Sequence, residues 1–202
     1  RRVLFRSPIV KKYGACVIGL TIDEDGIPST AEGRLKIAQK IVKRAAEYGI
    51  DKSDIIIDCL VLTASAQQSK VKETIRAVQL VKSTIGVKTT LGVSNVSFGL
   101  PRREILNRTF LVAALTAGLD APILNPLSED MMSTINAFNV LWNNDIASKK
   151  YIDIYSTFDG KKANKEITTK KDLKNIIIDG MKEEASKITK ELLKTIDRKS
   201  VV

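Results

Sequence analysis

Three polar side chains follow apolar runs of the chain at positions where they could bind a ligand. Asp58 ends a run of isoleucines, and Asn95 and Asn125 follow two later apolar runs. In a parallel α/β fold the carboxyl ends of the strands meet at one edge, and ligands bind there. A carboxylate among apolar residues, such as Asp58, needs a buried donor or a ligand as its partner. These residues are therefore candidates for a binding site.

The residue types present limit the chemistry. The sequence contains no histidine, which excludes histidine triads, histidine general bases and histidine-rich zinc sites, and we expect no metal site. Acid–base or binding chemistry must then use Asp, Glu, Asn, Arg or Cys. The acidic segment from Asp23 to Gly26 is interpreted as a turn.

The cysteine usage and the apolar pattern predict a cytoplasmic protein without a membrane partner. Cys16 and Cys59 lie in apolar, strand-like segments, and no secretory signal is recognisable. The longest apolar stretch, residues 110–124, is interrupted by polar residues and a glycine. It therefore falls short of the ~20 apolar residues that a membrane helix needs.

The two ends of the sequence resemble translated sequencing-adapter sequence, so residues 1–7 and 197–202 are left out of the expected fold. They hold five basic residues and one acidic residue, so the formal net charge falls from +10 to +6 without them. The remaining lysines are spread along predicted helices, and no basic cluster is interleaved with aromatic residues. We therefore expect no nucleic-acid partner.

Short apolar runs alternate with helical patterns along most of the chain. The helices are predicted to begin with Ser29, which has capping-box spacing to Glu32, with Pro101 at a first helical position, and with Ser128. Single helices between strands spaced by ~33 to 39 residues imply right-handed βαβ units, in a doubly wound sheet or in part of a (β/α)₈ barrel. The predicted buried strands are Ala15–Thr21, Asp54–Leu62, Val87–Val93 and Ala121–Asn125.

The pattern changes after about Leu141. A polar connection rich in lysine and asparagine follows, with a β-like segment from Tyr151 to Tyr155 inside it. Two amphipathic helical patterns come next, one from Thr168 or Thr169 to Asp179 and one from Lys182 to Lys194. They are interpreted as the first pair of an α-helical bundle.

One segment carries a specific resemblance to a known family. The stretch Gly92-Val-Ser-Asn-Val-Ser-Phe-Gly-Leu-Pro-Arg-Arg103, which continues to Phe110, resembles the seventh-strand signature of corrinoid-linked methyltetrahydrofolate methyltransferases. Residues 18–28 and 54–58 are similar to strands five and six, so the resemblance covers about residues 8–141. The helices beyond Ile167 resemble the entry to the cap bundle that precedes the cobalamin domain of cobalamin-dependent methionine synthases.

The resemblance implies a domain order. Residues 8–145 would be the C-terminal half of a dihydropteroate synthase-like (β/α)₈ TIM barrel, strands five to eight, and residues 146–166 a linker. Residues 167–196 would be the start of the cobalamin-domain helical cap. The implied enzyme is a methyltransferase that moves a methyl group from 5-methyltetrahydrofolate to cobalamin in methionine synthesis. Cobalamin and the zinc of a homocysteine domain would be held by other domains, and this piece alone is expected to be inactive.

The resemblance also implies roles for individual residues. Asp58 would hydrogen-bond the pterin, Asn95 would sit beside the nitrogen that carries the methyl group, and Arg103 and Asn125 would contact the folate. A carboxylate matches the amino group and ring N–H of a pterin as a two-pronged acceptor. An amide can both donate and accept, so it can follow a change of protonation at the departing nitrogen. One departure is Cys59, where proline is frequent in the family.

Three alternatives remain open at this point. The first is the methyltransferase that serves a corrinoid iron–sulfur protein, whose chain should end after the barrel. The second is dihydropteroate synthase, which should have Ser-Arg-Lys where this chain has Ser94-Asn95-Val96. The third is a non-catalytic α/β interaction module, which is distinguished by whether Asp58, Asn95 and Arg103 converge on one pocket.

Overall fold

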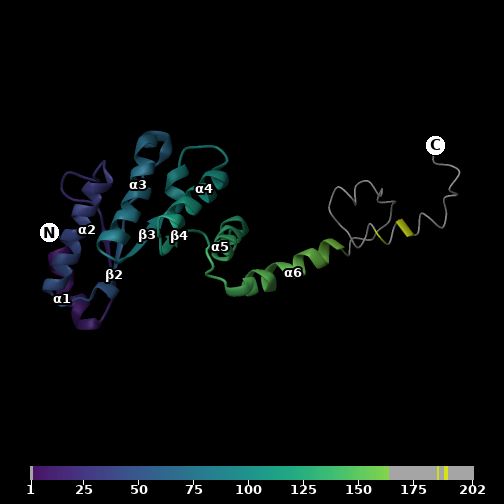
Figure 1. Cartoon of the computed structure of the whole chain (residues 1–202). Helices are drawn as coiled ribbons and strands as arrows, with labels where there is room; N and C mark the ends of the chain where they lie inside the picture. Colours follow the sequence, from purple (N-terminus) through teal and green to yellow (C-terminus); the bar gives the residue numbers. More distant parts are fainter. Residues whose placement is uncertain (1, 164–185, 187–188, 191–202) are drawn as a thin grey trace. The chain divides into compact units, whose positions relative to one another are not determined.

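The structure, a computed structural model, describes residues 2–163, residue 186 and residues 189–190. The chain divides into two compact units, Arg1–Ala147 and Ser148–Val202, and each is described by itself (Figure 1). Of the helical cap expected at residues 167–196, only residues 186, 189 and 190 are described, and the segment 197–202 lies outside the described residues. Residues 2–7, which were left out of the expected fold, form the first half of helix α1 (Arg2–Tyr13).

The first unit is built on one parallel sheet of four strands in the order β1-β2-β3-β4. The four predicted strands are confirmed, in chain order and with shorter bounds. The ladder of β2 stops at Asp58, which pairs with Leu20 and Thr90, because Leu60 turns away with a φ of 55°. The strands are β1 (Val17–Leu20), β2 (Ile55–Asp58), β3 (Lys88–Gly92) and β4 (Ala121–Ile123).

Each strand is followed by one helix. Because every crossover is parallel and moves to the next strand in the same direction, right-handed connections place all the helices on one face. The strand order never reverses, as it would in a doubly wound sheet, so the first unit is part of a (β/α)₈-type barrel. The helices that follow the strands are α2 (Ala31–Glu47), α3 (Ala64–Thr84), α4 (Arg103–Thr116) and α5 (Glu129–Leu141).

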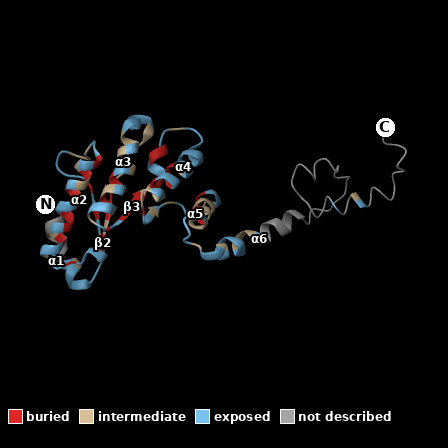
Figure 2. Ribbon diagram, in the orientation of Figure 1, coloured by how far each residue is buried: buried red, intermediate tan, exposed pale blue. Residues whose placement is uncertain are grey.

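The hydrophobic core lies between the sheet and these helices, and in Figure 2 buried residues follow the strands and the helix surfaces beside them. Gly19 lets α2 lie close to β1, since an added Cβ would come within 2.7 Å of Ile41 Cγ2. The neighbours Ile18 and Leu20 point to the other face of the sheet and are 57% and 46% exposed. Fully or almost fully buried members of the core are Ile55, Ile57, Val78, Val81, Val87, Leu91 and Leu111.

Two predicted helix starts are wrong and one is confirmed. Ser128 caps α5 as predicted, with its hydroxyl accepting from the N–H of Met131. Thr30, not Ser29, caps α2, because the extended backbone of Thr30 lets its hydroxyl accept from the N–H of Gly33. Glu32 does not complete a capping box, since its carboxylate binds Arg76 on α3 at 2.7 Å.

The third predicted start, at Pro101, is also displaced. Arg102 has a left-handed backbone with a φ of 50°, which a right-handed helix cannot include, so α4 begins only at Arg103. Short 3₁₀ turns precede or follow the main elements: η1 (Lys52–Asp54), η2 (Val93–Ser97) and η3 (Ile146–Ser148).

The predicted β-like segment Tyr151–Tyr155 is wrong, because these residues lie in helix α6 (Lys149–Ala163) of the second unit. Aromatic residues favour strands only weakly when no neighbouring strand is present to pack against them. On a helix, residues four apart are neighbours, and the rings of Tyr151 and Tyr155 lie 4.6 Å apart. Within the described residues, no helix has both the length and the apolar character that crossing a membrane requires.

Replacing the capping residue of α2 gives a direct test of the corrected helix start. We expect Thr30→Ala to lower the free energy of unfolding by about 1 kcal/mol, because it leaves the N–H of Gly33 without its side-chain acceptor. Ser29→Ala is the matched control and should change stability by less than ~0.5 kcal/mol. Urea unfolding of the two variants measures the difference. Equal destabilisation, or a larger effect at Ser29, would contradict the assignment of the cap.

Candidate functional site

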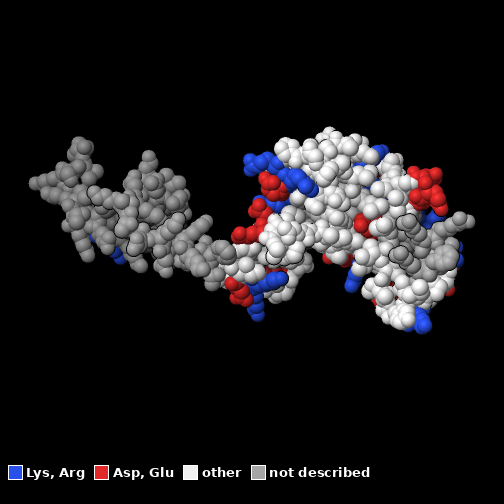
Figure 3. Space-filling model, turned by 180° about the vertical axis from the view of Figure 1, so that it is seen from behind, with Lys and Arg blue, Asp and Glu red and all other residues white. Residues whose placement is uncertain are grey.

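A cavity of about 360 Å³ opens at the carboxyl edge of the sheet. The loops after β2, β3 and β4 line it, so three consecutive strand ends contribute. Seen from behind, the first unit presents a broad surface of uncharged side chains with acidic and basic groups around it (Figure 3). The residues that line the cavity are Asp58, Leu60, Val61, Gly92, Ser94, Asn95, Ile123, Leu124 and Asn125.

Asp58 is the last residue of β2 and is 9% exposed. Its backbone carbonyl accepts from the N–H and the hydroxyl of Thr21 on β1, at 3.0 and 3.1 Å, which fixes the strand end. Its Oδ1 accepts from the N–H of Leu60 at 2.8 Å, while no hydrogen bond reaches Oδ2 from the described residues. Burial raises the pKa of Asp58, and the Leu60 N–H partly opposes that rise. The carboxylate therefore keeps one oxygen for a ligand.

The turn after Asp58 is strained. Leu60 has a φ of 55°, in the left-handed region that residues with a Cβ rarely occupy. Such a conformation costs roughly 1–3 kcal/mol and persists only where surrounding contacts fix it. Here it directs the N–H of Leu60 to Asp58 and places Leu60 in the cavity wall.

Asn95 lies in η2, directly after β3. The 3₁₀ turn repeats every three residues, so Val93 and Val96 are buried in the core while Ser94 and Asn95 face outward. Gly92 makes room for the amide, because a Cβ at residue 92 would come within 2.8 Å of Asn95 Nδ2. The turn therefore presents the Asn95 amide to the cavity from the end of β3.

Arg103 does not line the cavity. Its Nε donates to Ser97 Oγ at 3.0 Å and its Nη2 donates to the carbonyl of Ser94 at 2.9 Å. The guanidinium also lies 5.7 Å from the centre of the Phe98 ring. In this structure Arg103 therefore stabilises the turn that contains Asn95.

Asn125 follows β4 and lines the cavity. Its Oδ1 accepts from the N–H of Leu127 at 3.0 Å, so the side-chain carbonyl also stabilises the loop that leads into α5. The structure thus brings together Asp58, Asn95 and Asn125, and leaves Arg103 outside the cavity wall.

Sequence reasoning missed the residues that fasten these loops. The hydroxyls of Thr63 and Ser65 both donate to the carbonyl of Phe98, at 2.6 and 2.8 Å, and join the loop after β2 to the loop after β3. Nothing in the sequence marks Leu60 as left-handed, since leucine is not a turn residue. Gly92 stands inside the resembling segment and could have been recognised as the space that Asn95 needs.

Metal and thiol chemistry receive no support from the described residues. They contain no group of three or more His, Cys, Asp or Glu side chains that could hold a metal ion. Cys59 is buried next to Asp58, and burial raises the pKa of its thiol to about 12. The thiol is therefore neutral and a poor nucleophile at ordinary pH.

Comparisons with known proteins agree on one family. The sequence profile of the pterin binding enzymes matches residues 6–125. The methionine synthases of Mycobacterium leprae and Mycobacterium tuberculosis are 41% and 40% identical over 125 residues, which is 58% of this chain and 10% of each relative. The methylcorrinoid:tetrahydrofolate methyltransferase of Eubacterium limosum is 31% identical over 138 residues, 67% of this chain and 50% of the relative. The chain thus spans half or less of the length of these relatives.

Proposed function

The chain belongs to the pterin binding enzymes, and from that premise we propose that its cavity binds the pterin of 5-methyltetrahydrofolate and supports transfer of the methyl group to a corrinoid. The observation that carries the proposal is the meeting of Asp58, Asn95 and Asn125, from three strand ends, in one cavity. Of the three residues that were to distinguish a non-catalytic module, Asp58 and Asn95 share this cavity, whereas Arg103 lies outside it and holds the turn of Asn95. The names of the relatives, methionine synthase and methylcorrinoid:tetrahydrofolate methyltransferase, support this chemistry.

Asp58 is the proposed pterin-binding residue. A pterin presents an amino group beside a ring N–H, and a carboxylate accepts both in a two-pronged, charge-assisted pair. The available Oδ2 and the cavity position of Asp58 support this role. Asn125 would contact the same ligand from the end of β4.

Asn95 is the proposed catalytic residue. The nitrogen that loses the methyl group is a poor leaving group unless it is protonated or strongly hydrogen-bonded as the carbon–nitrogen bond breaks. An amide that both donates and accepts can stay bonded throughout that change. Arg103 would then act first by holding the turn of Asn95, and would reach the folate only if its side chain moved.

The roles of cobalamin and zinc are also proposals. Cobalamin would accept the methyl group at the mouth of the cavity, presented by another domain of the same polypeptide. Zinc would be held by a homocysteine domain elsewhere in the same polypeptide. Cys16 and Cys59 are free thiols, which agrees with a cytoplasmic enzyme.

A second candidate differs in the partner rather than in the cavity. The methyltransferase of Eubacterium limosum matches more of this chain than the methionine synthase of Mycobacterium leprae does, 67% against 58%, at a lower identity of 31% against 41%. The second candidate is therefore a methyltransferase that exchanges the methyl group with a corrinoid protein and does not use homocysteine. We define the full-length protein as the complete gene product that contains residues 8–196 of this sequence. Supplying it with homocysteine and methylcobalamin separates the candidates, because only a methionine synthase forms methionine.

The pKa of Asp58 predicts how folate binding depends on pH. Binding needs the ionised carboxylate, and burial raises the pKa of Asp58 above its ordinary value of 3.8. Affinity should therefore be constant near neutral pH and fall as the pH is lowered through that raised value, before an ordinary aspartate would protonate. Titrations of 5-methyltetrahydrofolate into the full-length protein between neutral and mildly acidic pH measure this.

The Asp58→Asn variant is the control for that profile, because it has no titrating group at this position. Its profile gives the part of the pH dependence that belongs to the ligand. Identical acid limbs for the two proteins would contradict the role of Asp58 in binding.

A further inference from the structure

Arg34 is a buried charge that the proposed chemistry does not use. It lies in the first turn of α2, is 0% exposed and is the largest fully buried side chain of the described residues. Its Nε donates to the carbonyl of Pro28 at 3.1 Å and its Nη1 donates to Thr74 Oγ1 at 2.6 Å, while Nη2 is buried without a hydrogen-bond partner in the described part of the chain. Burying an incompletely bonded charge is costly, so its presence needs an explanation.

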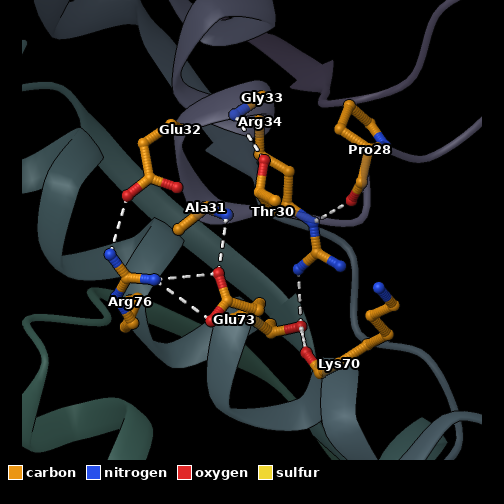
Figure 4. A network of polar contacts seen from close by, with 10 residues as sticks. Pro28, Thr30, Ala31, Glu32, Gly33, Arg34, Lys70, Glu73 and Arg76 are labelled. Atoms are coloured by element: carbon orange, nitrogen blue, oxygen red, sulfur yellow. Dashed lines mark hydrogen bonds and ion pairs between the residues drawn. The ribbon is translucent and has the colours of Figure 1, made fainter.

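Arg34 spans the gap from α2 to α3. In Figure 4 its side chain points away from Thr30 toward α3, beside a separate set of contacts in which Arg76 joins Glu32 and Glu73. Those contacts, together with the bond from the N–H of Ala31 to Glu73, already hold the two helices together at the surface. Helix packing alone therefore does not explain the buried guanidinium.

The partner of Arg34, Thr74, leads to the cavity. Thr74 is 0% exposed, and its hydroxyl accepts from Arg34, so its own proton is left for a carbonyl. Two carbonyls lie within reach, those of Leu60 and Lys70, both at 3.4 Å. The bond to Leu60 connects α3 to the strained turn beside Asp58.

Both polar backbone groups of Leu60 have a partner within reach. Its N–H donates to Asp58 Oδ1, and its carbonyl is one of the two acceptors that the Thr74 hydroxyl can reach. A leucine does not keep a left-handed conformation by itself, so outside contacts must fix it. Rotation of Leu60 out of this conformation would remove the N–H from Asp58 and free its carboxylate to turn.

We propose that Arg34 and Thr74 are positioning residues, which hold Leu60 in its left-handed conformation and thereby keep the Asp58 carboxylate directed into the cavity. The effect on folate rests on the proposed function, whereas the effect on Leu60 does not. Neither Arg34 nor Thr74 lines the cavity, so each acts through Leu60 and Asp58.

The test uses Thr74→Val, which keeps the shape of the side chain and removes the hydroxyl, with Thr74→Ser as the control that keeps it. In the full-length protein, Thr74→Val should weaken binding of 5-methyltetrahydrofolate about tenfold, as expected for loss of a buried hydrogen bond, and speed amide hydrogen exchange at Leu60. Thr74→Ser should stay within about twofold of the unaltered protein in affinity, because its hydroxyl persists.

A second substitution separates positioning from simple loss of stability. Glycine adopts a left-handed backbone without strain, so residue 60 no longer needs Thr74 once Leu60 is replaced by glycine. The double variant Leu60→Gly with Thr74→Val should therefore bind folate almost as well as Leu60→Gly alone. A general destabilisation would not be repaired by glycine. Affinity that stays low in the double variant, or that does not fall in Thr74→Val, overturns the proposal.

Failure of the proposed function can be distinguished from failure of the positioning role. If the unaltered full-length protein does not bind 5-methyltetrahydrofolate, the folate assignment fails and the positioning role is decided by hydrogen exchange alone. Faster exchange at the Leu60 amide in Thr74→Val but not in Thr74→Ser supports the role. Unchanged exchange at Leu60 in both variants overturns it.

Discussion

Replacing Asn95 with alanine is expected to slow methyl transfer about a hundredfold at saturating folate, while folate affinity changes by less than about threefold. The reason is timing, because a hydrogen bond to the departing nitrogen strengthens as the carbon–nitrogen bond breaks. Loss of one such contact costs ~3 kcal/mol in the transition state and little in the ground state. The rate of transfer to cobalamin as a function of folate concentration, in the full-length protein, separates the two effects.

The control for Asn95→Ala is another asparagine. Asn144→Ala removes an exposed amide that does not line the cavity, and it should leave the transfer rate unchanged. If Asn95→Ala transfers the methyl group at the unaltered rate once folate is saturating, Asn95 is a binding or turn residue and not a catalytic one.

Replacing Asp58 is expected to affect binding first. Asp58→Asn keeps an acceptor for the N–H of Leu60 but loses the charge, so folate should bind about 10- to 100-fold more weakly. Asp58→Ala should weaken binding at least as much, because it also leaves the Leu60 N–H without its acceptor. Once folate is saturating, the transfer rate of Asp58→Asn should return to within about threefold of the unaltered protein, since pterin contacts exist in both ground and transition states.

Asp58→Asn should also stabilise the fold at neutral pH. Because burial raises the pKa of Asp58, the folded protein holds that proton more tightly than the unfolded chain does. The contribution of Asp58 to stability is therefore present below its ordinary pKa of 3.8 and is lost as the pH rises through the raised value. Urea unfolding of Asp58→Asn at neutral pH checks this, with Asp54→Asn in the turn η1 before the strand as the control. If Asp58→Asn is less stable than the unaltered protein at neutral pH, the buried carboxylate does not destabilise the fold and this prediction is wrong.

The strands and their order were predictable because short, mostly apolar and β-branched runs, such as the isoleucines of β2, are typical of parallel strands. Periodicity does not distinguish the barrel from the doubly wound sheet. The family resemblance predicted the barrel, and the pairing of β1 with β2 and onward without reversal agrees with it. The displaced helix starts have local causes. Ser29 and Thr30 are equally good capping residues by type, and only the backbone conformation selects Thr30.

The site was predictable to the extent that strand ends determine it. Asp58, Asn95 and Asn125 share the cavity because they follow neighbouring strands, and the buried donor that Asp58 required is the N–H of Leu60. The place of Arg103 could not be predicted, because its long side chain reaches either the cavity or the turn beside it. The left-handed backbone of Leu60 depends on Thr74 and Arg34, which lie 14 and 26 positions away along the chain.

The transfer of the methyl group itself is the most direct test. The full-length protein is mixed with cob(I)alamin and 5-methyltetrahydrofolate that carries an isotopic label in the methyl group, and the label is followed through one turnover. We predict that the label appears in methylcobalamin with the unaltered protein, and about a hundredfold more slowly with Asn95→Ala at the same saturating folate. Label that remains in folate with the unaltered protein, although folate is bound, would contradict methyl transfer at this cavity.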